Sequence, residues 1–212
     1  MANKNKKNQI HQANQRRVKQ QQYEAATKNL SLFSFIALGI SVLLLFLLFV
    51  SFADVYNTTA GVGVEVKVSG WSFAIAALTD TYSSADSVYG NLAVPFYYYA
   101  GEWCETLAIF ALFSVLIMVL NIVVQIFAAV KKIYVLNAVS AILSVIAAIL
   151  LIVCFVEGLA MKNGEILTTY CSNNPACSIR SFAIIPAIVA LGSAAVSTVA
   201  TVKHAKASRL LK

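Results

Sequence analysis

The stretch Val42–Val50, which reads VLLLFLLFV, contains nine consecutive apolar residues. It lies inside a longer apolar run at residues 32–53. A helix of about 20 residues crosses the hydrocarbon core of a bilayer, which is roughly 30 Å thick, and satisfies its own backbone hydrogen bonds there. A helix in a soluble protein is usually only about 10–14 residues long. The run at 32–53 therefore predicts a transmembrane helix.

Three further apolar runs of similar length follow, at residues 107–130, 133–156 and 182–202. The composition agrees with this pattern, because hydrophobic residues make up 59% and charged residues only 12% of the chain. A soluble domain carries roughly a quarter charged residues, since it must cover its surface with polar groups. We therefore expect a single all-α membrane domain, residues 30–203, in which four transmembrane helices form a bundle.

The distribution of charge predicts the orientation of these helices. Most of the 16 basic residues lie in three segments, namely 1–29, the inner turn at 131–132 and the end of the chain, with a basic tail at 204–212. All acidic residues except Glu24 lie in or beside the two longer connections, 54–103 and 157–180. Short segments rich in Lys and Arg stay on the cytoplasmic side of a membrane. The sequence thus predicts a multi-pass protein of the cell (plasma) membrane with both termini in the cytoplasm.

A cleaved signal peptide is an alternative for the first apolar run. The residues Ser51, Phe52 and Ala53 resemble the small-residue cleavage site of such a peptide, and cleavage would leave three spans. However, the run exceeds the usual apolar length of about 7–15 residues, and the leader before it is unusually long. We therefore expect the first span to be retained.

Residues 1–29 are rich in Lys, Arg, Gln and Asn and contain few apolar side chains. Such a segment cannot bury enough apolar surface to fold alone, so we expect it to be largely disordered, with a helix only near residues 20–29. The basic clusters at both termini should contact the lipid bilayer through its anionic headgroups, at about 1 kcal/mol per residue close to the surface. Nucleic acid is not expected as a partner, because no folded module or interleaved aromatic residues accompany the charge.

The first outer loop, residues 54–103, is too long to be a simple connection. Valines alternate with other residues at positions 62, 64, 66 and 68, which is typical of a half-buried β-strand. Gly70 permits a turn, after which Trp71, Phe73 and Ile75 continue the alternation as a second strand. A short interfacial helix over residues 71–78 is the alternative. Either way, we expect a small extracellular β-strand segment in this loop.

Aromatic residues gather near the end of the same loop. The run at positions 96–99 contains Tyr97, Tyr98 and Tyr99, and Trp103 follows it. Aromatic side chains with polar edges concentrate at the membrane–water boundary, so this group is interpreted first as an aromatic belt at the outer end of the second span. The alternative is an interaction surface for a sugar or peptide, to which Trp71 and Phe73 would also contribute.

The second outer loop, residues 157–180, contains Cys171 and Cys177 on either side of an Asn-Asn-Pro turn. On the oxidising face of the membrane these two cysteines are candidates for a local disulfide. A zinc site is not expected, because no histidine or second cysteine pair lies nearby. Cys104 and Cys154 lie near the outer boundary, where they would either pair or act as small packing residues.

The interiors of the four predicted spans contain no charged residue, but they contain uncharged polar ones. Such residues form hydrogen bonds between helices or line a path for a polar solute. The candidates for intramembrane polar contacts are Asn121, Gln125, Asn137, Ser140 and Ser144. With an inner turn at 131–132, a helical rise of about 1.5 Å per residue places Gln125 opposite Asn137 and Asn121 opposite Ser140. In the fourth span, small residues including Ser193 and Ser197 favour close helix packing.

Four spans, cytoplasmic ends, a long first outer loop with strand character before Trp71 and a shorter second loop resemble the claudin and peripheral-myelin-protein class of tetraspan proteins. The resemblance is one of topology over most of residues 32–202. It carries over no functional residue, because the loop has Ser69-Gly70-Trp71 and lacks the Trp…Gly-Leu-Trp signature and cysteine pair of that family.

Two classes of function follow. The first is a non-enzymatic membrane scaffold or accessory protein that acts through a homo-oligomer or a membrane-protein partner. The alternative is a small transport or permeation subunit with a polar path between the second and third spans. No nucleophile–base pair or metal cluster has a recognisable spacing, so we expect neither enzymatic activity nor a cofactor.

Overall fold

A computed structural model of the chain describes residues 2–49, 51–57, 64–79, 102–163, 178–181 and 184–209. Of these, the side chains are described for residues 14–49, 69–79, 106–157, 159 and 184–209. The elements, in chain order, are α1 (Ala2–Thr27), α2 (Leu30–Leu47), β1 (Ser51–Asn57), β2 (Val64–Ser69), α3 (Gly70–Thr79), α5 (Glu102–Val130), α6 (Leu136–Asn163), β3 (Ser178–Ser181) and α8 (Ile184–Ser208).

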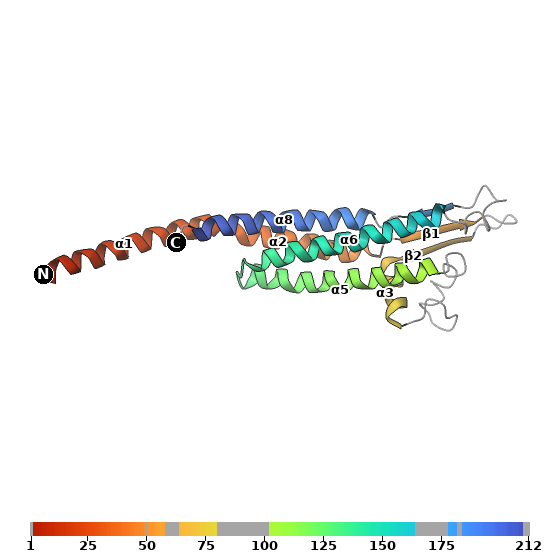
Figure 1. Cartoon of the computed structure of the whole chain (residues 1–212), viewed down its shortest axis with the longest axis horizontal. Helices are drawn as coiled ribbons and strands as arrows, with labels where there is room; N and C mark the ends of the chain where they lie inside the picture. Colours follow the sequence, from red (N-terminus) through yellow and green to blue (C-terminus); the bar gives the residue numbers. More distant parts are fainter. Residues whose placement is uncertain are drawn as a thin grey trace.

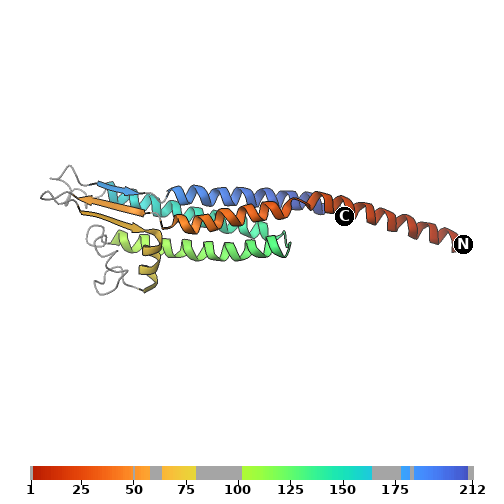
Figure 2. The ribbon, with the colours of Figure 1, turned by 180° about the vertical axis from the view of Figure 1, so that it is seen from behind.

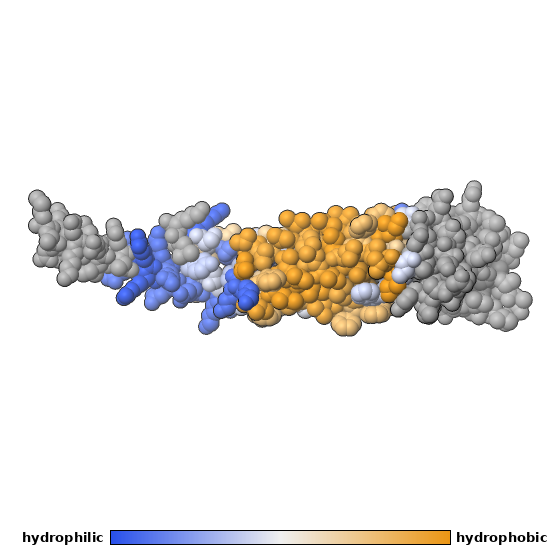
Figure 3. Space-filling view, turned by 90° about the horizontal axis from the view of Figure 1, so that it is seen from below, coloured by the Kyte–Doolittle hydropathy of each residue, from blue (hydrophilic) through white to orange (hydrophobic). Residues whose placement is uncertain are grey.

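Four helices, α2, α5, α6 and α8, lie side by side as a bundle (Figures 1 and 2). Each is long and apolar enough to cross a membrane. Helix α6 packs between α5 and α8, and α2 contacts both α5 and α8, which closes the bundle. Large apolar side chains such as Phe46, Ile142 and Ile188 point outward and are more than 60% exposed. On the face seen in Figure 3, apolar residues form a continuous band across the middle of the molecule. These are the features of a multi-pass membrane protein.

The two ends of the bundle differ (Figure 1). One end carries the strands and α3, and we call it the sheet end. The other carries α1, the carboxyl-terminal part of α8 and the α5–α6 connection, and we call it the terminal end. The composition of the bundle interior also changes from the sheet end to the terminal end. An apolar cluster that includes Leu48, Phe73, Leu107 and Leu151 lies toward the sheet end. Most of the buried polar side chains lie in the other part of the bundle, together with small apolar ones such as Ala37, Ala128 and Ala200.

The first span is shorter than predicted. The apolar run suggested a helix over 32–53, but α2 begins at Leu30 and ends at Leu47, and the next residues turn toward strand β1. Trp71 stabilises this early end, because its indole Nε1 donates to the Leu45 carbonyl oxygen at 2.9 Å and its backbone N–H donates to the Leu48 carbonyl oxygen at 3.2 Å. These contacts satisfy carbonyl groups that lack a partner at the carboxyl end of a helix. The indole also stacks on Phe49, with ring centroids 5.6 Å apart.

The amino-terminal segment also differs from its prediction. Residues 1–29 were expected to be largely disordered, whereas α1 is helical from Ala2 to Thr27. The segment contains no Gly or Pro and is rich in Ala, Gln, Lys and Arg, which have high helix propensity. Gln20 also donates to Glu24 one turn later, at 3.5 Å. Helix α1 extends away from the terminal end of the bundle (Figure 1).

The three strands form one antiparallel sheet in the order β2-β1-β3. In the register, Val55 of β1 lies opposite Val66 of β2 on one side and Ile179 of β3 on the other. Strand β2 overlaps the stretch of alternating valines, whereas β1 and β3 lie in segments for which no strand was predicted. The chain is therefore not purely helical, because the sheet combines residues from both of the longer connections between spans.

Residues 70–79 form helix α3, so the prediction of a second strand through Trp71, Phe73 and Ile75 is wrong. Ser69 precedes the helix as its N-cap, and its hydroxyl oxygen accepts the Ser72 backbone N–H at 3.1 Å. Helix α3 runs across the long axis of the bundle and packs against α5 (Figures 1 and 2). Its inward side buries Phe73, Ala74 and Ala76, a spacing typical of a helix rather than of a strand.

Candidate functional site

Seven polar side chains from all four spans form one buried hydrogen-bonded cluster, which we call the polar core. Its members are Ser41 of α2, Asn121 and Gln125 of α5, Ser140 and Ser144 of α6, and Ser193 and Ser197 of α8. Each is at most 3% exposed. Because every helix contributes at least one member, the polar core links the whole bundle.

The two amides of α5 act as donors at the centre of the polar core. Asn121 Nδ2 donates to the hydroxyl oxygens of Ser41 at 3.2 Å and Ser144 at 3.0 Å. Gln125, one turn further along the same face, donates through Nε2 to Ser140 at 2.8 Å and Ser193 at 3.3 Å. Each amide thus bridges α5 to two other helices.

Ser193 of α8 is the most connected hydroxyl of the polar core. It lies 2.9 Å from the Ser41 hydroxyl, accepts the Ser144 hydroxyl at 3.2 Å and accepts Gln125 Nε2. Ser197, one turn along α8, lies 3.0 Å from Ser140. Small side chains let the helix backbones approach closely, and their hydroxyls then supply the interhelical hydrogen bonds.

A separate polar pair lies near the terminal end, where the Ser34 hydroxyl donates to Asn137 Oδ1 at 3.0 Å. Ser34 is 3.3 Å from the carbonyl oxygen of Leu30 as well, so its hydroxyl has an alternative acceptor within its own helix. Both side chains are fully buried. This pair joins α2 to α6, as the polar core does further along the bundle.

All five predicted contact residues form hydrogen bonds, but their pairing differs from the prediction. Gln125 was placed opposite Asn137, and Asn121 opposite Ser140; instead Gln125 bonds Ser140 and Asn121 bonds Ser144. The cause is the connection between the helices. It was predicted to contain residues 131–132 only, whereas α6 begins at Leu136, and Lys132 has a φ of 57°. The longer turn shifts each partner on α6 by about one helical turn.

The sequence interpretation missed Ser34 of the separate pair and Ser41 of the polar core. Ser34 and Ser41 lie seven residues apart on α2, hence on one face of the helix, and both are at most 1% exposed. That spacing within an otherwise apolar run was the available signal. Ser193 and Ser197 were recognised only as small packing residues, yet their hydroxyls also form hydrogen bonds to other helices.

Three buried amide atoms have no hydrogen-bond partner in the described part of the chain: Asn121 Oδ1, Gln125 Oε1 and Asn137 Nδ2. Buried polar atoms are usually paired, so each of these atoms retains an unused capacity to bind. Two are acceptors and one is a donor. The polar core can therefore hold a small neutral or cationic polar species only by rearranging, because its members are closed to solvent.

The predicted outer interaction surface is only partly described. Phe73 is fully buried in the apolar cluster and Trp71 is half-buried against Phe49 and Leu45, so these two do not form a surface as predicted. Tyr97, Tyr98 and Tyr99 lie outside the described residues, and so does the side chain of Trp103. The large apolar side chain that α3 exposes is instead Leu78, at 72%.

The structure tests the cysteine predictions only in part. Cys171 and Cys177 lie outside the described residues, so their proposed disulfide stays a prediction. Cys154 is a free thiol, 1% exposed, within the apolar cluster, which corresponds to the role of a small packing residue. Among the described residues, no group of three His, Cys, Asp or Glu side chains is arranged to hold a metal ion.

Comparisons of the chain with protein families, with curated proteins and with solved structures found no match.

Proposed function

We propose that this chain is a non-enzymatic membrane scaffold or accessory protein. The observation that supports this most is the polar core, in which the hydroxyls and amide donors of all four spans bind one another and are closed to solvent. Each such interhelical bond contributes about 0.6 kcal/mol, and the set makes the bundle a rigid support. Its polar groups are used to hold helices together rather than to process a substrate.

In this proposal the sheet end is the part that contacts a partner. Among the described residues, strands β2 and β3 each pair with β1 alone, which makes them the edge strands of the sheet, and edge strands are common sites of association. Helix α3 directly follows β2 and exposes Leu78. The partner would be another membrane protein or a second copy of this chain, as also expected from the topological resemblance to claudin-like tetraspan proteins.

We further propose that the protein lies in the plasma membrane with the terminal end in the cytoplasm. The support is the charge distribution, because the basic residues of α1, of the α5–α6 connection and of the end of α8 belong to one end of the bundle. The sheet would then lie on the extracellular side, where a partner protein could reach it.

A photo-crosslinking experiment tests the scaffold proposal. A photoreactive amino acid placed at Leu78 on α3 should give a protein–protein adduct in intact cells, because this side chain is 72% exposed at the sheet end. The same amino acid at Leu120, which is 50% exposed in the apolar band of α5, is the matched control and should react mainly with lipid. Absence of a protein adduct at Leu78, or equal adducts at both positions, would contradict the proposed docking end.

The alternative function is a small transport or permeation subunit. One specific observation supports this alternative. Asn121 Oδ1, Gln125 Oε1 and Asn137 Nδ2, within the spans, have no hydrogen-bond partner among the described residues. In a more open arrangement they would bind a polar solute that crosses between α5 and α6. This function requires that the amides contribute to flux rather than to stability, which distinguishes it from the scaffold proposal.

A further inference from the structure

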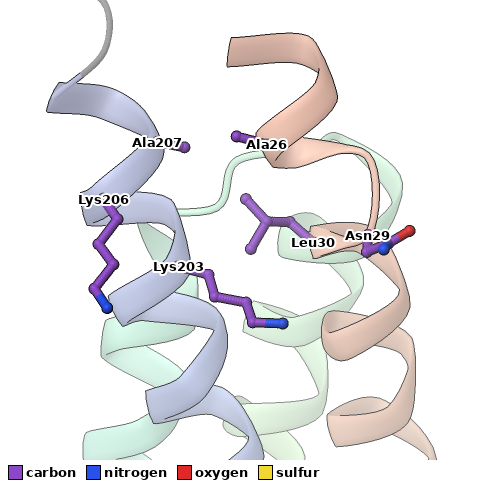
Figure 4. Close-up of a pocket in the computed structure, with 6 residues that line it drawn as sticks. All are labelled: Ala26, Asn29, Leu30, Lys203, Lys206 and Ala207. Carbon is purple, nitrogen blue, oxygen red and sulfur yellow. The ribbon is translucent and has the colours of Figure 1, made fainter. Parts of the chain in front are cut away.

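A notch of about 410 Å³ lies at the terminal end, between the α1–α2 junction and the end of α8. It is lined by Ala26, Asn29, Leu30, Lys203, Lys206 and Ala207 (Figure 4). We call it the terminal notch. Leu30 and Ala207 are buried at 1% and 2% exposure and form its apolar part, whereas both lysines are exposed. In Figure 4 the Lys203 amine extends from α8 toward α2, and the methyl groups of Ala26 and Ala207 face each other.

The terminal notch has a positive charge that its surroundings do not balance. Lys203 and Lys206 are followed by Arg209, and Lys28 adjoins the α1–α2 junction. Glu24 is the only acidic residue in the first 53 positions, and none follows residue 165. The side chain of Asn29 makes no capping hydrogen bond to α2. The notch therefore receives the ammonium group of Lys203 and has a second one, that of Lys206, on the adjoining side of α8, and such charges suit a phosphate group.

The position of the notch indicates where that phosphate comes from. Figure 3 shows the surface change from the apolar band to a hydrophilic region at the terminal end. On α2 the change begins just after Leu30, because Leu32 is 57% exposed and Phe35 is 50% exposed toward the lipid side. On α8 the last exposed large apolar residue, Val202 at 47%, immediately precedes Lys203. The notch thus lies at the level of the lipid headgroups.

One of the two lysines is held at this boundary. Lys203 Nζ lies over the Phe33 ring, 4.1 Å from its centroid, which is a cation–π contact. The ring occupies one side of the ammonium group and leaves other donor directions for an anion. Lys206, one turn further from the apolar band, extends along the outer side of α8 in Figure 4. In this view the two ammonium groups end at a similar level on opposite sides of α8, and only that of Lys203 faces α2.

We propose that the terminal notch binds the phosphate-bearing headgroup of an anionic glycerophospholipid. The phosphate binds to Lys203 in the notch, Lys206 adds its positive charge from the outer side of α8, and the acyl chains lie along the apolar band. The bound lipid bridges α8 and the α1–α2 junction and so fixes the direction in which α1 leaves the membrane. This site requires only that the helices span a bilayer, and it is independent of the scaffold or transport role.

The test uses the full-length chain in a mild detergent and counts bound lipids by native mass spectrometry. Phosphatidylglycerol is the anionic probe and phosphatidylcholine the zwitterionic comparison. Changing Lys203→Gln and Lys206→Gln together should weaken phosphatidylglycerol binding about thirtyfold, the factor that corresponds to about 1 kcal/mol for each lysine. The matched control is Lys131→Gln with Lys132→Gln, which removes the same charge from exposed residues at the same end of the bundle. This control should retain binding within about twofold.

A second variant tests the shape of the notch while its charge stays unchanged. Ala26→Leu keeps both lysines but fills the space opposite Ala207, so it should also reduce phosphatidylglycerol binding while the melting temperature stays unchanged. Equal loss in the two double-lysine variants would show unspecific surface attraction and overturn the proposal. Undiminished binding by Ala26→Leu, or by the Lys203 and Lys206 variant, would overturn it too. Displacement of the lipid by excess inorganic phosphate would show a site for the free anion instead.

Discussion

Replacing Phe73 by alanine should lower the free energy of unfolding by about 3–5 kcal/mol, the usual range for a fully buried phenylalanine. Phe73 is 0% exposed and belongs to the apolar cluster that contains Leu48, Leu107 and Leu151. Its removal leaves a cavity where α3 docks on the bundle. The measurement is unfolding of the purified protein in mixed micelles with increasing denaturing detergent.

The matched control for this change is Leu78→Ala on the same helix. Leu78 is 72% exposed, so the variant should lose less than about 1 kcal/mol. If Phe73→Ala were no more destabilising than Leu78→Ala, α3 would not be docked through Phe73. The original expectation that Phe73 contributes to an exposed aromatic surface would then be restored.

Replacing Ser193 by leucine should also have a large effect, a loss of about 3–5 kcal/mol. Ser193 is 1% exposed and lies among Ser41, Ser144 and Gln125. A leucine there overpacks the contact between α8 and its neighbours, at a cost of about 1–3 kcal/mol, and removes several interhelical hydrogen bonds worth about 0.6 kcal/mol each. The readout is the same detergent-induced unfolding.

The adjacent residue provides a matched control. Gly192 is exposed, and a Cβ added there would meet no atom within 4 Å. Gly192→Leu should therefore be neutral or slightly stabilising, since glycine in a helix interior costs about 0.5–1 kcal/mol relative to alanine. Similar losses for both variants would mean that position 193 is not the buried one and that α8 has a different rotation in the bundle.

The four spans could be predicted from the sequence because lipid imposes a strong and simple constraint. A run such as Val42–Val50 has no stable place in a small soluble protein, and only a helix satisfies its backbone in hydrocarbon. The same constraint singled out Asn121, Gln125, Asn137, Ser140 and Ser144, because polar residues in such runs need partners. All five do form hydrogen bonds.

The pairing of those residues could not be predicted, because it depends on the length of the turn between α5 and α6. Hydropathy continues through Ile133 and Val135, so the sequence gives no sign that α6 begins only at Leu136. The end of the first span was misplaced for a related reason. Residues up to Ala53 are apolar enough for a helix, but Trp71 caps Leu45 and Leu48 from a distant part of the chain. Strand β3, only four residues long, carries too little pattern to be recognised alone.

The central claim is that the polar core holds the helices together, and the bond between Gln125 and Ser140, at 2.8 Å, tests it most directly. The measurement is a double-mutant cycle of unfolding free energies with Gln125→Leu, Ser140→Ala and both changes together. A structural bond predicts that the two changes are not additive, with a favourable coupling of about 0.6 kcal/mol and at most about 1.7 kcal/mol. Additivity within about 0.3 kcal/mol, in variants that all remain folded, would contradict the claim and favour a polar path between α5 and α6.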